Sequence, residues 1–207
     1  MKNTENLKIV KAGVGWVTHD SFGCENKKLS YKHEGIKSLY SRLRNDSIFL
    51  ADIKNFGRFD LSSKMVCCAA ALALHDAGFI YSALEKRETF GIVGTSENGS
   101  LDSNEKYFRD YVAEGRELAR GNLFIYTLPS SALAEAAICL GLGGPMLYVG
   151  TDTDYTESVL RRARAIITQQ DAETMLAVNF SDKNATCYCL KKEPCAAERL
   201  KSEGDRA

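Results

Sequence analysis

The residues whose types and spacing could do chemistry lie at one turn, where Thr153 stands between Asp152 and Asp154. A threonine hydroxyl acts as a nucleophile when a nearby base removes its proton. A short apolar run precedes this turn and an amphipathic segment, 155–168, follows it, which predicts a strand, a tight turn and a helix. Free backbone N–H groups at a helix N-terminus stabilise anions. Thr153 is therefore the candidate nucleophile.

The flanking carboxylates weaken this candidate. Threonine has no form of low pKa, and the charges of Asp152 and Asp154 disfavour an alkoxide by like-charge repulsion. Asp154 also has a simpler role, because an aspartate followed three residues later by Glu157 has the form of a capping box, and both charges suit the positive end of a helix. We expect Asp154 to cap the helix, and no residue is assigned as catalytic.

The bulk composition bounds the fold and the function. The 207 residues suffice for one well-packed domain, with or without a tail. The 27 Lys and Arg balance the 27 Asp and Glu, so charge favours neither nucleic acid nor a membrane surface as a partner. No apolar run approaches the roughly 20 residues of a membrane span, and residues 1–7 lack the apolar core of a signal peptide. We expect a cytoplasmic protein.

The seven cysteines do not form a metal-binding pattern. Cys187 and Cys189 share one face of a predicted strand, and Cys195 could supply a third ligand, but a structural zinc site needs four. Buried free thiols are the expected state in a reducing compartment. We expect neither a metal nor another cofactor.

Three histidines and one glutamate complete the acid–base candidates. His19, His33 and His75 match no ligand or triad spacing, so we expect surface residues. Glu135 lies in an otherwise apolar helix, where a partly buried carboxylate needs a hydrogen-bonding partner. We expect it to hold a neighbouring loop, and a role in a site is the alternative.

Strands and helices alternate through most of the chain. Strands are predicted over 7–17, 91–95, 146–151, 173–181 and 185–191. Helices are predicted after an N-cap at Asp60 and over 105–119, 132–140 and 155–168, with a helical turn at 38–43, an extended segment at 123–131 and a surface excursion at 27–37. Such alternation favours a mixed, largely parallel sheet covered by helices.

Several sequence blocks, in their order, resemble the N-terminal half of the β-ketoacyl synthases. They are Asp60–Met65 before an Ala-rich helix, Gly91–Thr95, Thr127–Ser131, Ala134–Ile138, Gly141–Pro145 and Asp171–Leu176. The resemblance spans about 8–191 and implies an α/β, thiolase-like half (βαβαβαββ) with a mixed, mostly parallel five-stranded sheet. We expect a single domain over 1–193 and a polar tail over 194–207.

The resemblance also implies a chemistry from which this chain departs. The family condenses acyl chains on acyl carrier protein, using a Cys at the strand-to-helix turn and two His from the C-terminal half. Here the Cys position matches Thr153. The sequence ends before a second half could supply the two His, and its three histidines match no catalytic position.

The leading hypothesis is a non-catalytic subunit of the chain-length-factor type, which pairs with an active ketosynthase in fatty-acyl or polyketide biosynthesis. In the family, the strand before the nucleophile turn pairs with its mate across a two-fold axis. The implied partners are a full-length ketosynthase or a second copy of this chain, and an acyl carrier protein. The pairing strand maps onto Met146, Leu147, Tyr148, Val149, Gly150 and Thr151.

Two alternatives stay open. An acyl transferase or thioesterase-like enzyme would use Thr153 as nucleophile, with Asp152, Asp154 or Glu135 as its base. A carrier-protein-binding scaffold module would use the arginines of helix 155–168, whose helical wheel places apolar residues on one face and charged residues on the other. These arginines are Arg161, Arg162 and Arg164.

Overall fold

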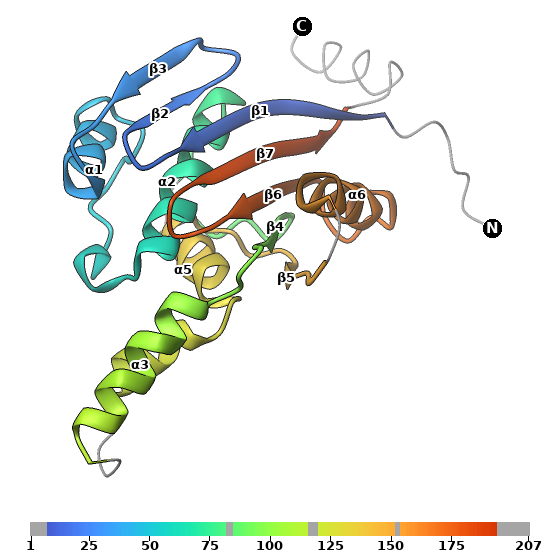
Figure 1. Cartoon of the computed structure of the whole chain (residues 1–207). Coiled ribbons are helices and arrows are strands. Elements are labelled where there is room, and N and C mark those ends of the chain that lie inside the picture. The colour runs from blue at the N-terminus through green and yellow to red at the C-terminus, as the bar shows by residue number, and fades with distance from the viewer. Residues whose placement is uncertain (1–7, 82–84, 116–119, 152–153, 194–207) are drawn as a thin grey trace, which may run out of the picture.

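The computed structural model describes residues 8–81, 85–115, 120–151 and 154–193. Seven strands form one mixed sheet in the order β3-β2-β1-β7-β6-β4-β5 (Figure 1). The predicted tail, 194–207, lies outside the described residues. The strands are β1 (Ile9–Val17), β2 (Ser21–Cys24), β3 (Leu29–Lys32), β4 (Phe90–Thr95), β5 (Met146–Tyr148), β6 (Thr174–Phe180) and β7 (Ala185–Lys192).

The mixed α/β character is confirmed, but the prediction of five mostly parallel strands is wrong. Four neighbouring pairs run antiparallel: β1 with β2, β1 with β7, β2 with β3, and β6 with β7. Among the described strands, only β4 pairs in parallel, with β5 and with β6. The alternation of strands and helices describes β4 to β6 correctly. Strands β2 and β3 have four residues each, which is too short for a periodic signal.

Six α-helices and two short 3₁₀ helices occupy the described residues. The helices predicted after Asp60, over 132–140 and over 155–168 are confirmed, and the turn at 38–43 belongs to a longer helix. The extended segment predicted at 123–131 is wrong, because most of it is helical and Leu128, just before Pro129, has extended backbone angles. The elements are α1 (Ile36–Asn45), η1 (Phe56–Arg58), α2 (Leu61–Asp76), α3 (Leu101–Ala113), α4 (Gly121–Phe124), η2 (Ile125–Thr127), α5 (Ser131–Leu140) and α6 (Tyr155–Thr168).

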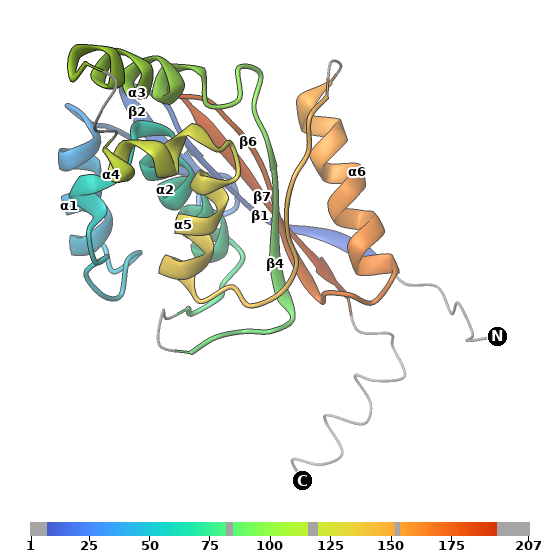
Figure 2. The same ribbon diagram turned by 90° about the horizontal axis from the view of Figure 1, so that it is seen from below.

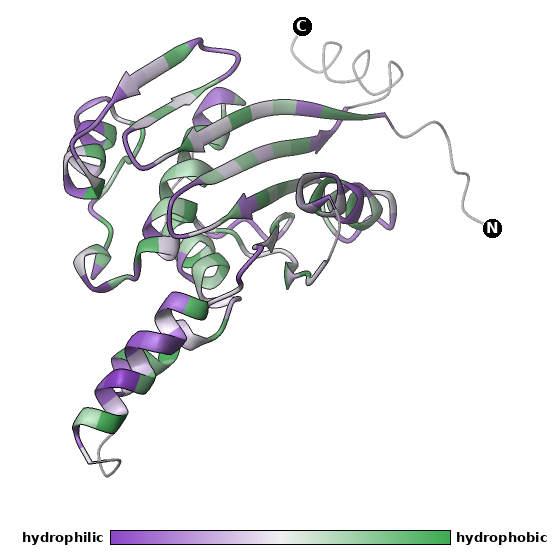
Figure 3. Cartoon of the chain, viewed as in Figure 1, coloured by the Kyte–Doolittle hydropathy of each residue, from purple (hydrophilic) through white to green (hydrophobic). Residues whose placement is uncertain are grey.

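Helix α2 forms the core on one face of the sheet, beside α5 (Figure 2). The side chain of Asp60 caps it by accepting the Ser63 N–H at 2.8 Å. Its small residues let β1 approach very closely, since a Cβ placed on Gly15 would lie 2.4 Å from the Ala69 carbonyl oxygen. Figure 3 shows that hydrophobic residues make up much of α2 and of the central strands.

Helix α6 covers the opposite face of the sheet (Figure 2). Val159, Ala163 and Ile167 are buried against it, whereas Arg161 and Arg164 are exposed. The prediction of a one-sided helix is therefore confirmed, and its charged face meets solvent in this chain.

The segment from α3 to α5 carries much of the exposed apolar surface. Helix α3 extends from the body (Figure 1) and buries no side chain fully, although its Tyr107 ring contacts Phe124 edge-on at 5.6 Å between centroids. The helix was predicted over 105–119, but it begins and ends earlier. Gly115, at a φ of 69°, follows its end. Among the described helices none alone is long and apolar enough to cross a bilayer, although the bent pair Gly121–Thr127 and Ser131–Leu140 meets that test when its lengths are combined.

Candidate functional site

The predicted strand lies at an edge of the sheet, and the predicted helix packs on one face of it. Strand β5 pairs with β4 and comprises only Met146 to Tyr148, so the predicted strand over 146–151 is shortened to three residues. Just beyond it, the Val149 N–H still donates to the Gly94 carbonyl at 2.9 Å. Asp152 and Thr153 lie outside the described residues, and helix α6 starts at Tyr155.

Asp154 caps α6, as predicted. Its Oδ1 accepts the Glu157 N–H at 3.0 Å, which satisfies one of the free donors of the first turn. The Glu157 carboxylate lies 3.5 Å from Arg164 Nη1, on the same side of the helix, and adds negative charge near the positive end of the helix dipole.

Two residues tie the ends of β4 and β6 to the end of β5 and to the first turn of α6, and no sequence pattern indicated them. Thr95 Oγ1 donates to the Val149 carbonyl at 2.6 Å and holds the end of β5 on β4. Asn179 Nδ2 donates to Thr156 Oγ1 at 3.3 Å and ties the end of β6 to the first turn of α6. Ligand sites in α/β sheets occur at the carboxyl ends of parallel strands, which is the signal that could have indicated these residues.

These joining groups are hydroxyls and an amide, which hold and orient but do not act as bases near neutral pH. The three histidines lie elsewhere. Within the described residues, His33 contacts Thr18 and Gly35, and His75 Nε2 lies 3.0 Å from Lys27 Nζ. Burial, with the Lys27 charge, lowers the pKa of His75.

Glu135 also lies away from the α6 turn. Its Oε1 accepts a hydrogen bond from the Tyr126 hydroxyl at 3.1 Å, which confirms the expectation that it holds a neighbouring loop. Burial and the nearby Glu135 charge raise the pKa of Tyr126, so this phenol stays protonated and keeps donating. Glu135 is also one of the residues that line a pocket between α5 and residues 49–54.

The described residues contain no group of three or more His, Cys, Asp or Glu side chains that could hold a metal ion. Cys187 and Cys189 are both buried on one face of β7, as predicted, while Cys195 lies outside the description. Burial raises the pKa of Cys189 to about 12, so its thiol is protonated at neutral pH. These two cysteines pack as small apolar side chains.

Solved structures share this fold at low sequence identity. A beta-ketoacyl synthase from Burkholderia phymatum STM815 has a TM-score of 0.65 and 15% identity, over 96% of this chain and 61% of that one. The ishigamide ketosynthase/chain length factor has a TM-score of 0.62 and 15% identity, over 91% and 63%. A type II PKS acyl-carrier protein in complex with its ketosynthase has a TM-score of 0.63 and 13% identity, over 94% and 65%.

This chain therefore spans slightly less than two thirds of the length of those solved chains. A search of curated proteins found no significant match. Residues 26–186, however, match the family described as "Beta-ketoacyl synthase, N-terminal domain". That match covers well over half of the sequence and includes residues 146–168 and the ends of β4 and β6. The chain belongs to the β-ketoacyl synthase family.

Proposed function

We propose that this chain is a non-catalytic subunit of the chain-length-factor type, which pairs with an active ketosynthase in fatty-acyl or polyketide biosynthesis. The observation that carries the proposal is the open edge of β5, the last strand of the sheet. The residues on either side of β5 bond to β4: the Pro145 carbonyl accepts the Ile92 N–H, and the Val149 N–H donates to the Gly94 carbonyl. Because bonding sides alternate along a strand, Met146 and Tyr148 direct their N–H and C=O groups to the open edge. A partner strand can pair there.

Apolar surface beside this edge supports assembly. Helix α5 packs against β5, and its Ile138 is 71% exposed. Phe124, Ile125 and Leu128, which precede α5, are each more than half exposed. A three-residue strand offers few hydrogen bonds, so apolar contacts of this kind would supply most of the free energy of association.

The sequence supports the absence of condensing chemistry, because Thr153 stands at the position that matches the family's Cys. Two of the similar structures are a ketosynthase/chain length factor and a ketosynthase in complex with its chain length factor. A pair made of one active and one inactive subunit is the arrangement that we propose for this chain.

Light scattering on the purified chain, alone and co-expressed with a ketosynthase from the same host, tests the proposal. We expect a species of at least twice the 22.8 kDa chain mass at tens of micromolar protein, or a stable complex with the ketosynthase. A monodisperse monomer that retains neither a ketosynthase nor a carrier protein during purification would overturn it.

The outer face of α6 favours a second role, the recognition of a carrier protein. Arg161 and Arg162 are exposed there and form no ion pair with another described residue, whereas Arg164 lies near Glu157. Unpaired cations on a solvent face suit an acidic partner. Replacing Arg161 and Arg162 by Glu should weaken carrier-protein binding in a pull-down, and unchanged binding would leave the arginines as a solvated helix face.

A further inference from the structure

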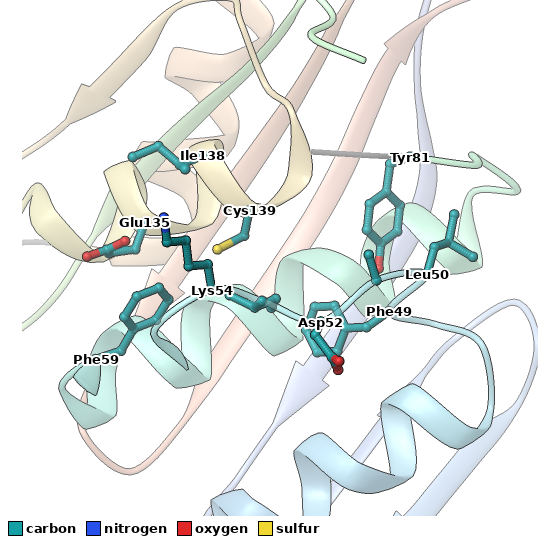
Figure 4. A pocket seen from close by; sticks show the side chains of 11 residues that line it. Phe49, Leu50, Asp52, Lys54, Phe59, Tyr81, Glu135, Ile138 and Cys139 are labelled. Carbon is teal, nitrogen blue, oxygen red and sulfur yellow. The ribbon is translucent and has the colours of Figure 1, made fainter. Parts of the chain in front are cut away.

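Two cysteines from different helices lie against one another beside the pocket between α5 and residues 49–54. Cys139 of α5 lines this pocket and is partly exposed, and Figure 4 shows its side chain pointing from the helix toward the pocket. Cys67 of α2 is fully buried, and its side chain is hydrogen-bonded to that of Cys139. The pair therefore consists of one thiol that solvent reaches and one that it does not.

The packing of α2 against α5 holds this pair together. The two helices lie directly against each other, and Cys139 packs against the cluster of buried residues that contains Cys67. Cys68, the next residue of α2, is equally buried but forms no hydrogen bond with Cys139 among the described contacts. Successive side chains of a helix point about 100° apart, so Cys67 is the one directed at Cys139.

The two thiols differ in their access to an oxidant. Oxidation by a peroxide needs a sulfur that is accessible and able to lose its proton. The contact with Cys139, together with burial, raises the pKa of Cys67 well above its usual range, so this thiol stays protonated. The other described cysteines apart from Cys139 are buried as well. An oxidant that enters from solvent therefore meets Cys139 first.

We infer that Cys139 is a site of oxidation by hydroperoxides and that Cys67 converts the oxidised residue to a disulfide between α5 and α2. In the first step the Cys139 sulfur attacks the O–O bond and becomes a sulfenic acid. The other oxygen leaves with the thiol proton, as water or an alcohol. In the second step the Cys67 sulfur attacks the sulfenic sulfur. The S–S bond forms as the S–O bond breaks, and the hydroxyl leaves with the Cys67 proton as water. The two thiols lose two electrons, which the peroxide gains.

The disulfide would fix α5 to the core helix α2. Helix α5 also packs against β5, so the bond would restrain the element that supports the open edge of the sheet. Both cysteines belong to one chain, and the chemistry needs no partner. The inference therefore goes beyond the assembly role, and each can fail without the other.

Peptide mapping of the oxidised full chain tests the inference. Cys195→Ser removes the cysteine outside the described residues. The folded protein is treated with hydrogen peroxide, free thiols are blocked with N-ethylmaleimide in denaturant, and peptides are analysed by mass spectrometry without reduction. We expect a peptide that contains Cys139 to be linked to the peptide of α2, and dithiothreitol to break the link. If peroxide produced no such link, the inference would be overturned.

Two variants of neighbouring buried residues identify the cysteine of α2 that reacts. Cys67→Ala should reduce the linked peptide at least about tenfold and leave Cys139 as a sulfenic acid that dimedone traps, because the second thiol is missing. Cys68→Ala is the matched control and should form the link like the wild type. Thermal unfolding checks that both variants fold. Cys139→Ser, at a partly exposed position, should abolish the link whether or not Cys67→Ala folds. A link that persists in a folded Cys67→Ala protein or in Cys139→Ser would overturn the pairing.

Discussion

Asp76 accepts the backbone N–H of Val14 at 2.9 Å across 62 residues of sequence. The same carboxylate accepts the N–H groups of Asn26 and Lys27 at 3.0 and 2.9 Å. Asp76 thus joins the C-terminal end of α2 to β1 and to the turn that follows β2. Burial disfavours its charge, but the three backbone donors outweigh that effect and lower the pKa of Asp76.

Asp76→Asn should therefore lower the free energy of unfolding by about 1–3 kcal/mol at pH 7, because one charged acceptor is lost. A lowered folded pKa means that the stabilisation is complete above the unfolded value, near 3.9, and is lost as the pH falls through the folded pKa. Urea unfolding at pH 7 and at about pH 3 measures both effects. The difference between wild type and variant should shrink at the lower pH.

Asp46→Asn is the matched control, since Asp46 forms an exposed pair with Arg42. It should change stability by less than about 1 kcal/mol. Equal losses in the two variants would contradict the role assigned to Asp76.

Gly15→Ala should destabilise the fold by about 1–3 kcal/mol or more, because the new Cβ would meet the α2 backbone. Thermal unfolding checks this loss. Gly57→Ala is its control, because a Cβ at Gly57 meets no atom within 4 Å and the residue has no positive φ. A Gly15→Ala protein as stable as Gly57→Ala would contradict the close approach of β1 to α2.

The parts of the fold that the sequence predicted are those with local causes. Helix α6 has apolar residues at a period of 3.6 and an aspartate cap. The apolar period lies within the 14 residues of the helix, and the cap immediately precedes them. Helix α2 combines a cap at Asp60 with a run of small residues. Each was identified because its signals, a cap and an apolar or small-residue pattern, lie in consecutive residues.

The contacts that build the site could not be predicted in this way. Thr95 meets Val149 across 54 residues, and Asn179 meets Thr156 across 23. Their approach depends on the order of strands in the sheet, and β1 joins β7 through a register that no local pattern encodes. The same dependence explains why the sheet was predicted to be mostly parallel.

Asp154→Ala should lower stability by about 1 kcal/mol through loss of the cap on α6, and Asp154→Ser should restore most of it. Urea unfolding measures both variants. Because we assign Asp154 a capping role, the oligomeric state should not change in either. A loss of assembly in Asp154→Ala with unaltered stability would show that the residue acts at an interface instead.

Met146→Pro tests the edge of β5 directly. The Met146 N–H points away from β4, so proline removes a donor from the open edge and leaves the bonds between β4 and β5 in place. We expect the dissociation constant of the assembly to rise at least tenfold, which corresponds to about 1.4 kcal/mol, as measured by sedimentation velocity over a range of concentrations. Met146→Leu keeps the backbone donor and an apolar side chain, and it should assemble like the wild type. If Met146→Pro also assembled like the wild type, strand pairing at this edge would be excluded, and the exposed side chains of α5 would be the next surface to test.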